Sequence, residues 1–124
     1  MKGILALCAA TFVLLVGLAL TYLWQQERYG ETSPAALPVS VSQLVMQPQD
    51  YAGKVVRVEG KITGQCRATG CFFYFATGGK KIKIELGQIL TTLGRREGKR
   101  ALVEGEVVSY EDTFQIVASS IEIR

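Results

Sequence analysis

Two cysteines, Cys66 and Cys71, come closest in type and spacing to a chemical site in this chain. Four residues separate them, and one of these is Gly70, which permits a tight turn. In an oxidising compartment such a pair forms a structural disulfide, worth roughly 2 kcal/mol for so short a ring. The two thiols could instead hold a soft metal such as Cu(I) or act as a redox pair. We predict the disulfide and keep the metal or redox carrier as an alternative.

Zinc binding and disulfide exchange suit these two thiols less well. A zinc site needs four ligands, but the chain has no histidine, and its third cysteine, Cys8, lies in an apolar segment. A thioredoxin-like motif has two residues between its cysteines, whereas four lie between this pair. The sequence therefore predicts no bound metal ion.

A second candidate is a surface of basic and aromatic side chains on the first three long strands expected in the chain. Because side chains alternate along a strand, six of them should share the outer face. They are Arg57, Lys61, Phe72, Tyr74, Lys81 and Lys83. Such a face can bind single-stranded nucleic acid by phosphate pairing and base stacking. It can equally be a solvated face or contact a protein, and Glu59 and Glu85 dilute its positive charge.

The chain lacks the usual parts of an enzyme active site. It contains no histidine, which removes the commonest general base near neutral pH and the usual axial haem ligand. Ser119 and Ser120 have no neighbouring base, and the run from Thr77 to Lys80 is too short for a phosphate-binding loop. The net charge of +3 is far below that of a dedicated nucleic-acid binder. We predict a protein that is not an enzyme and needs no cofactor.

An apolar N-terminal segment determines where these residues operate. Gly3 to Trp24 is a run of 22 residues without a charge, and as a helix it would span about 33 Å, close to the bilayer core of about 30 Å. A cleaved signal peptide would have a shorter run ending in small residues, whereas this one ends in bulky Tyr22 to Trp24. A lipoprotein site at Cys8 would follow too short an apolar stretch. We predict that residues 1–24 are retained as a transmembrane anchor.

The charges beside this segment predict its orientation. Lys2 and the free N-terminus precede it, while Arg28 beyond it is flanked by Glu27 and Glu31. This balance places the N-terminus in the cytoplasm. The expected location is a bacterial inner (cytoplasmic) membrane, crossed once, with the folded domain on the periplasmic or extracytoplasmic side.

The rest of the chain divides into a linker and one domain. Residues 25–38 are polar, then small and proline-containing, which is typical of a linker. From residue 39 onward the pattern is β-like, with a short helix predicted at 42–47 before Pro48 and a second at 88–96. Five strands are expected, at 54–64, 71–76, 81–86, 100–109 and 113–123.

A repeated pattern supports this assignment of strands. Gly53-Lys54 is followed by Gly60 at the same spacing as Gly98-Lys99 is followed by Gly105. A glycine in mid-strand permits the sharp coiling that closes a small barrel. Three strands, a helix and two strands is the order of the OB fold, a five-stranded barrel. We therefore predict a mainly β protein in which residues 39–124 form an OB-fold domain after a transmembrane helix.

Part of the domain follows the pattern Tyr-x-Gly-Lys-x-Val-x-Val-x-Gly, then Cys-x-x-x-Gly-Cys and an aromatic residue. The residues of this pattern are Tyr51, Gly53, Lys54, Val56, Val58, Gly60, Cys66, Gly70, Cys71 and Phe72. In this stretch the chain resembles a family of small secreted or membrane-attached bacterial OB-fold proteins of unknown function, which share the pattern. The resemblance implies an OB fold and brings no established activity.

The predicted plan is also similar to that of the haem chaperone of cytochrome c maturation, which has one membrane helix and a periplasmic OB barrel. That protein attaches haem through a histidine, and this chain has none. The similarity therefore implies the architecture and not the haem chemistry.

Three functions remain after these exclusions. The first is a non-catalytic binding or assembly module that is tethered to the membrane and contacts another envelope or membrane-complex protein. The second is a metal or redox carrier that uses Cys66 and Cys71. The third is single-strand nucleic-acid binding by the basic and aromatic face, which ranks last because nucleic acid is scarce in the predicted compartment.

Overall fold

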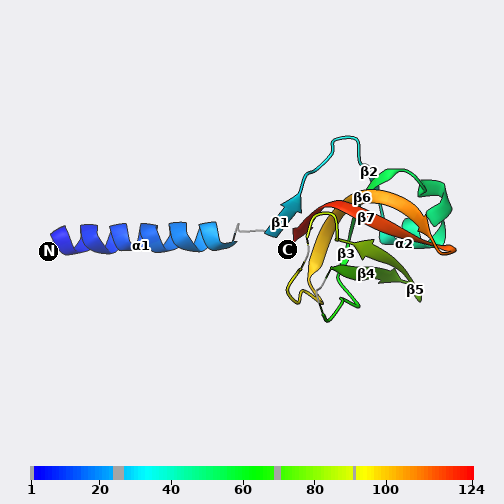
Figure 1. The fold of residues 1–124 in the computed structure, drawn as a ribbon. Coiled ribbons are helices and arrows are strands. Elements are labelled where there is room, and N and C mark those ends of the chain that lie inside the picture. The colour runs from blue at the N-terminus through cyan, green and yellow to red at the C-terminus, as the bar shows by residue number, and fades with distance from the viewer. Residues whose placement is uncertain (1, 24–26, 69–70, 91) are drawn as a thin grey trace.

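A computed structural model describes residues 2–23, 27–68, 71–90 and 92–124 of the chain. Its first element is helix α1 (Lys2–Leu23), in which the side chains of residues 2–22 are exposed. The remaining elements form a β domain that α1 precedes (Figure 1). The expected apolar helix is confirmed, and it is long and apolar enough to cross a membrane.

Five strands form the barrel of the β domain. They are β3 (Val55–Lys61), β4 (Phe72–Thr77), β5 (Lys80–Glu85), β6 (Arg100–Tyr110) and β7 (Thr113–Ile123). They are hydrogen-bonded in the order β3-β6-β7-β5-β4, and β5 runs parallel to β7 while the other pairs are antiparallel. Two backbone hydrogen bonds between Thr63 and Tyr74, of 3.0 and 2.8 Å, return β4 to the end of β3. This is the strand order of the OB fold, as the sequence predicted.

The alternation of side chains along the strands fills the barrel. Val56 and Val58 on β3, and Ile82 and Ile84 on β5, point inward, while the residues between them lie at the surface or half-buried. On β4 the inward residues are aromatic, and they include Phe75, which is fully buried. The apolar set is therefore one continuous core.

The two mid-strand glycines are needed for different reasons. A Cβ atom on Gly60 would lie 2.9 Å from the ring of Phe75, so the missing side chain makes room for that ring. A Cβ atom on Gly105 would overlap the backbone carbonyl oxygen of Val117, and the register between β6 and β7 shifts at Glu104/Gly105. Gly105 therefore permits the bulge at which β6 bends.

The segment predicted to be a linker contributes two strands, which corrects its assignment. Strand β1 (Glu27–Gly30) pairs antiparallel with the end of β7, and β2 (Leu37–Val39) pairs parallel with β3. These residues have no apolar pattern of their own. They are ordered because they pair with strands β7 and β3, which come later in the sequence. Of the predicted linker, residues 25 and 26 lie outside the described residues. The C-terminus and β1 lie side by side (Figure 1).

One of the two short helices expected in the domain is present. Helix α2 (Val41–Met46) starts with a capping box between Ser40 and Gln43, and it buries Leu44 and Val45 against the core. A 3-10 helix, η1 (Pro48–Tyr51), follows it. The helix predicted at 42–47 is confirmed, and each of its ends lies one residue earlier than predicted.

The helix predicted at 88–96 is wrong. The structure has a turn at residues 87–89 and no helix among residues 92–96, while residue 91 lies outside the described part. Ile89 and Leu90 still pack against the core, and Leu93 is buried in it. The buried side chain of Gln65 hydrogen-bonds backbone groups of Leu93, Gly94 and Arg96. These bonds hold the segment in an irregular conformation, so its apolar residues are buried without a helix.

Candidate functional site

Four of the six residues predicted for a binding face lie together on the outer side of β4 and β5. They are Phe72, Tyr74, Lys81 and Lys83, and we call them the aromatic–lysine face. Tyr74 lies directly opposite Lys83 in the pairing of the two strands. The rings of Phe72 and Tyr74 meet edge to face, with centroids 6.0 Å apart and an interplanar angle of 82°.

Each ring of this face carries a lysine. The Nζ atom of Lys81 lies 4.3 Å from the ring centroid of Tyr74, and that of Lys83 lies 4.5 Å from the ring centroid of Phe72. Contacts of this kind contribute about 0.5–1 kcal/mol at exposed sites. Lys83 also forms an ion pair with Glu85, with 3.4 Å between Nζ and Oε2, whereas Lys81 forms no ion pair among the described residues. Because each lysine covers one ring, a planar ligand must displace it in order to stack there. The face thus presents positive charge above apolar rings, which suits an anionic group better than a stacked base.

Arg57 does not belong to this face. Its Nε atom lies 2.7 Å from Oε1 of Glu104, and its Nη2 atom donates to the carbonyl oxygen of Ser33 at 3.3 Å. The carboxylate of Glu104, which is almost completely buried, also accepts a hydrogen bond of 2.7 Å from the backbone N–H of Ser33. Arg57 therefore fastens the chain before β2 to the barrel instead of facing a ligand.

Lys61 is also separate from the face, because it lies at the end of β3 opposite Arg100. The prediction that all six residues form one surface is thus wrong for Arg57 and Lys61. Both residues alternate along β3 as an outward position requires, but β3 is hydrogen-bonded to β6 and β2. Its hydrogen bonds to β4 begin only beyond its last residue, at Thr63.

Sequence reasoning missed two aromatic residues that extend the face. Tyr110 and Phe114 flank the turn between β6 and β7, and together with Gln115 they line a groove of about 350 Å³ that continues from Tyr74 and Lys81. Tyr110 is 52% exposed. The groove exists because β5 pairs in parallel with β7, a contact that the order of residues along the chain does not reveal. The feature of the sequence that could have indicated this groove is the presence of two aromatic residues beside a turn.

Cys66 and Cys71 lie at the base of one loop. The backbone N–H of Cys66 donates to the carbonyl oxygen of Phe72 at 3.1 Å, and the carbonyl oxygen of Cys71 accepts from Leu86 at 2.8 Å. Both side chains are half-buried, and no disulfide joins them among the described residues. Gly70, predicted to form the turn, lies outside the described part. No group of three or more candidate metal ligands occurs in residues 2–23, 27–68, 71–90 and 92–124.

The predicted disulfide is testable on the intact protein. We expect the full chain, purified without reductant and with free thiols blocked, to have a mass lower by two hydrogens than its reduced form. A Cys66→Ser variant should lack this difference, because Cys71 then has no second cysteine nearby in the sequence with which to form a disulfide. Complete alkylation of both thiols, or copper that stays bound through purification, would contradict the disulfide and favour the carrier.

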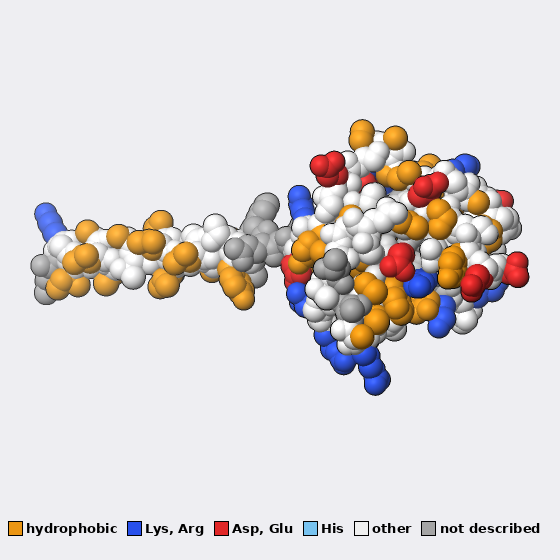
Figure 2. Space-filling model, viewed as in Figure 1, with side chains coloured by type: hydrophobic (Ala, Val, Ile, Leu, Met, Phe, Trp, Pro, Cys, Tyr) orange, Lys and Arg blue, Asp and Glu red, His pale blue; other side chains and the backbone are white. Residues whose placement is uncertain are grey.

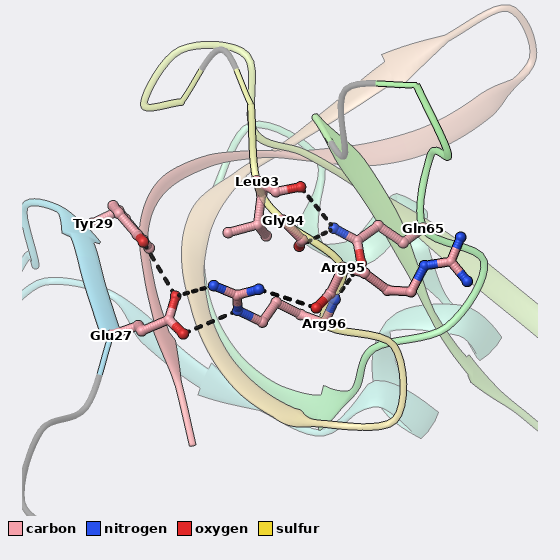
Figure 3. A network of polar contacts seen from close by, with 7 residues as sticks. All are labelled: Glu27, Tyr29, Gln65, Leu93, Gly94, Arg95 and Arg96. Carbon is pink, nitrogen blue, oxygen red and sulfur yellow. Dashed lines mark hydrogen bonds and ion pairs between the residues drawn. The ribbon is translucent and has the colours of Figure 1, made fainter. Parts of the chain in front are cut away.

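A polar network joins β1 to the loop before β6 (Figure 3). Arg96 donates two hydrogen bonds to the carboxylate of Glu27, of 2.9 and 3.1 Å, and the hydroxyl of Tyr29 donates a third at 3.1 Å. The bonds from Arg96 lower the pKa of Glu27 from its ordinary value, more than burial raises it. Burial and the bond to Glu27 raise the pKa of Tyr29. On the far side of the same loop, Gln65 accepts from the backbone N–H of Arg96 at 2.7 Å.

This network predicts a pH dependence of stability. Because the pKa of Glu27 is lowered in the folded state, its contribution is present above the ordinary value near 4.5 and is lost as the pH falls below it. We expect the Glu27→Gln variant to be less stable than the wild type at pH 7 and to approach it toward pH 3 in urea unfolding. Glu97→Gln is the control, since Glu97 forms no ion pair among the described residues. Wild-type and Glu27→Gln curves that stay parallel between pH 7 and 3 would contradict the role of the network.

Comparison with known proteins adds support for the fold. No family model matches the chain, and no curated protein matches it either. An aspartyl-tRNA synthetase chain from Leishmania major Friedlin is 14% identical, with a TM-score of 0.55 over 74% of this chain. The match corresponds to 21% of the synthetase chain. The Stn1-ten1 complex of S. pombe contains a chain that is 12% identical, with a TM-score of 0.51 over 75% of this chain and 78% of that one.

The hypothetical protein ygiW from E. coli is 14% identical, with a TM-score of 0.49 over 77% of this chain and 98% of that one. At these identities, the neighbours with a TM-score above 0.5 support the fold and carry no information on activity. Together with the strand order, the comparisons support an OB fold for the β domain that follows α1.

Proposed function

We propose that this protein is a membrane-tethered binding module without catalytic activity, which holds an OB domain beside the bilayer to contact another protein of the membrane or envelope. The observation that carries the proposal is the aromatic–lysine face and its continuation into the groove beside Tyr110 and Phe114. Aromatic side chains are enriched at the centres of protein interfaces, and charged side chains such as the two lysines suit the surrounding polar rim.

The position of the groove fits such a partner. Glu27, the first described residue after α1, pairs with Ile123 at the end of β7, whereas the groove adjoins Thr113 at its beginning. An 11-residue strand spans about 33 Å. The groove therefore opens at the end of the barrel away from the tether, where a large partner has access. We infer from the balance of charges on the two sides of α1 that the domain lies on the extracytoplasmic side.

Site-specific photocrosslinking in intact membranes tests this proposal. A benzophenone amino acid at Tyr74 or at Tyr110 is expected to give the same discrete adduct, because both residues line the groove. The control is Gln49, which is exposed on η1 outside the groove. Lysine-to-glutamine changes at both Lys81 and Lys83 should reduce the adduct at Tyr110. The proposal would be overturned if all three positions gave the same adducts, or if no position gave an adduct.

Single-strand nucleic-acid binding is the second candidate, because the same face combines aromatic rings with lysines. The two lysines that cover the rings weigh against it. Binding of a labelled oligonucleotide that falls with salt and with Tyr74→Ala would favour this candidate. The absence of binding at low salt would eliminate it.

A further inference from the structure

The end of the β domain that adjoins α1 is much more basic than the rest. Backbone pairing brings four segments to this end, since Glu27 lies opposite Ile123, Lys61 opposite Arg100, and Gln65 binds the loop before β6. We call residues 27–28, 59–68, 92–100 and 122–124 the proximal end. It contains eight Lys and Arg against four Asp and Glu. The rest of residues 27–124 contains five Lys and Arg against seven Asp and Glu.

Several of these positive charges are free to meet a partner. Three of the four carboxylates of the proximal end are in ion pairs with arginines. Four exposed cations have no ion pair among the described residues: Lys61, Arg67, Arg95 and Lys99. Blue side chains gather along the lower edge of the domain on the side of α1, while many red ones lie on its upper and far sides (Figure 2). The domain thus has a positive end next to its tether.

The tether keeps this end close to whatever surface α1 enters. Three residues lie between Leu23, where α1 ends, and Glu27, where β1 begins. Four Cα steps of at most about 3.6 Å limit their separation to roughly 14 Å. The bonds from Arg96 to Glu27 and from Gln65 to the same loop make the proximal end one connected unit with β1. If α1 crosses a bilayer, the basic residues lie within about one or two Debye lengths of the headgroups.

We infer that the proximal end docks on anionic phospholipid headgroups and so orients the barrel with its groove away from the bilayer. This inference rests on the proposed membrane tether. Basic residues near an anionic leaflet contribute about 1 kcal/mol each, which is about fivefold in the docking equilibrium per residue. The contacts are between ammonium or guanidinium groups and lipid phosphates, so they weaken with salt.

Hydrogen exchange of the full chain in lipid nanodiscs tests the inference. We expect amides in residues 92–100 to exchange several-fold more slowly in discs with anionic phosphatidylglycerol than in zwitterionic phosphatidylcholine alone. Amides around the turn at 111–112 should not change, because that turn is at the other end of β7. High salt should remove the difference. Equal exchange in the two lipids, or a difference that survives high salt, would overturn the inference.

A matched pair of variants locates the effect. Changing Lys61 and Lys99 to glutamine should lower the docking equilibrium constant by roughly 10- to 30-fold, at about fivefold per lysine, and so remove the lipid-dependent protection. Changing Lys54 and Lys80 to glutamine removes the same charge from exposed positions outside the proximal end and should leave the protection unchanged. Equal effects of the two pairs would show a response to net charge and would overturn docking through the proximal end.

A flotation assay separates this inference from the proposal on which it rests. Reconstituted protein that washes off vesicles in alkaline carbonate lacks a membrane-crossing α1, and the tether itself then fails. Protein that remains on the vesicles but shows the same exchange in both lipids keeps the tether and refutes only the docking.

Discussion

Replacing Gly105 with alanine is expected to destabilise the protein by about 3 kcal/mol, the upper range for an inserted methyl group. The added Cβ atom would overlap the carbonyl oxygen of Val117 and come within 2.8 Å of the Cα atom of Ala118. Both are backbone atoms in β7, so no side-chain rotation relieves the clash. Urea unfolding followed by circular dichroism measures the loss, and the bulge between β6 and β7 should be disrupted with it.

Two other glycines provide a graded control for this result. Gly60→Ala places its Cβ atom 2.9 Å from the ring of Phe75, a side chain in a full core, and is expected to cost about 1–2 kcal/mol. In Gly87→Ala the new Cβ atom would lie 3.2 Å from one carboxylate oxygen of Glu85, at the end of a flexible side chain. This change should alter stability by no more than about 0.5 kcal/mol. Any other order of the three would contradict the packing described for the barrel.

Replacing Arg57 with alanine should cost about 2–3 kcal/mol. The change leaves the carboxylate of Glu104, which is 3% exposed, with the backbone N–H of Ser33 as its remaining hydrogen-bond donor among the described residues. Removing one member of a buried ion pair costs about 3–5 kcal/mol, and we expect a loss at or below the lower end of that range because Arg57 itself is 37% exposed. The loss is measured by urea unfolding at pH 7.

This result separates a structural role of Arg57 from a binding role. Lys61→Ala on the same strand is the control, and it should change stability by less than about 0.5 kcal/mol because Lys61 is exposed and forms no ion pair among the described residues. The double variant Arg57→Met with Glu104→Gln should recover part of the loss, since no buried charge is then left alone. A stable Arg57→Ala protein with weakened crosslinking from Tyr110 would instead place Arg57 in the binding face.

The sequence predicted most of the barrel because its strands carry the pattern that a half-buried sheet requires. Alternation along β3 and β5 identified their inward residues, and the glycines marked positions where the barrel needs space. It missed β1, which has polar residues and is ordered by pairing with β7, far along the chain. It also assigned a helix to residues 88–96, because helical spacing of apolar residues does not reveal that Gln65 takes the backbone hydrogen bonds.

The candidate face was predicted in part for the same reason. Parity along neighbouring strands correctly grouped Phe72, Tyr74, Lys81 and Lys83, since β4 and β5 form a simple hairpin. Parity along β3 could not show that residues before β2 cover Arg57. The groove with Tyr110 and Phe114 depends on the parallel pairing of β5 with β7, which arises only when the sheet is assembled.

The antiparallel pairing of β1 with β7 has a mechanical consequence. A partner that pulls on the turn between β6 and β7 draws β7 from its first residue, Thr113, while α1 holds β1 at Glu27. The two forces act along the strands and in opposite directions, so they load the backbone hydrogen bonds of the β1–β7 ladder together, in shear, rather than opening them one after another. The ion pair between Glu27 and Arg96 adds a side-chain fastening at the loaded end. The short polar strand thereby becomes the joint through which tension passes between α1 and the barrel.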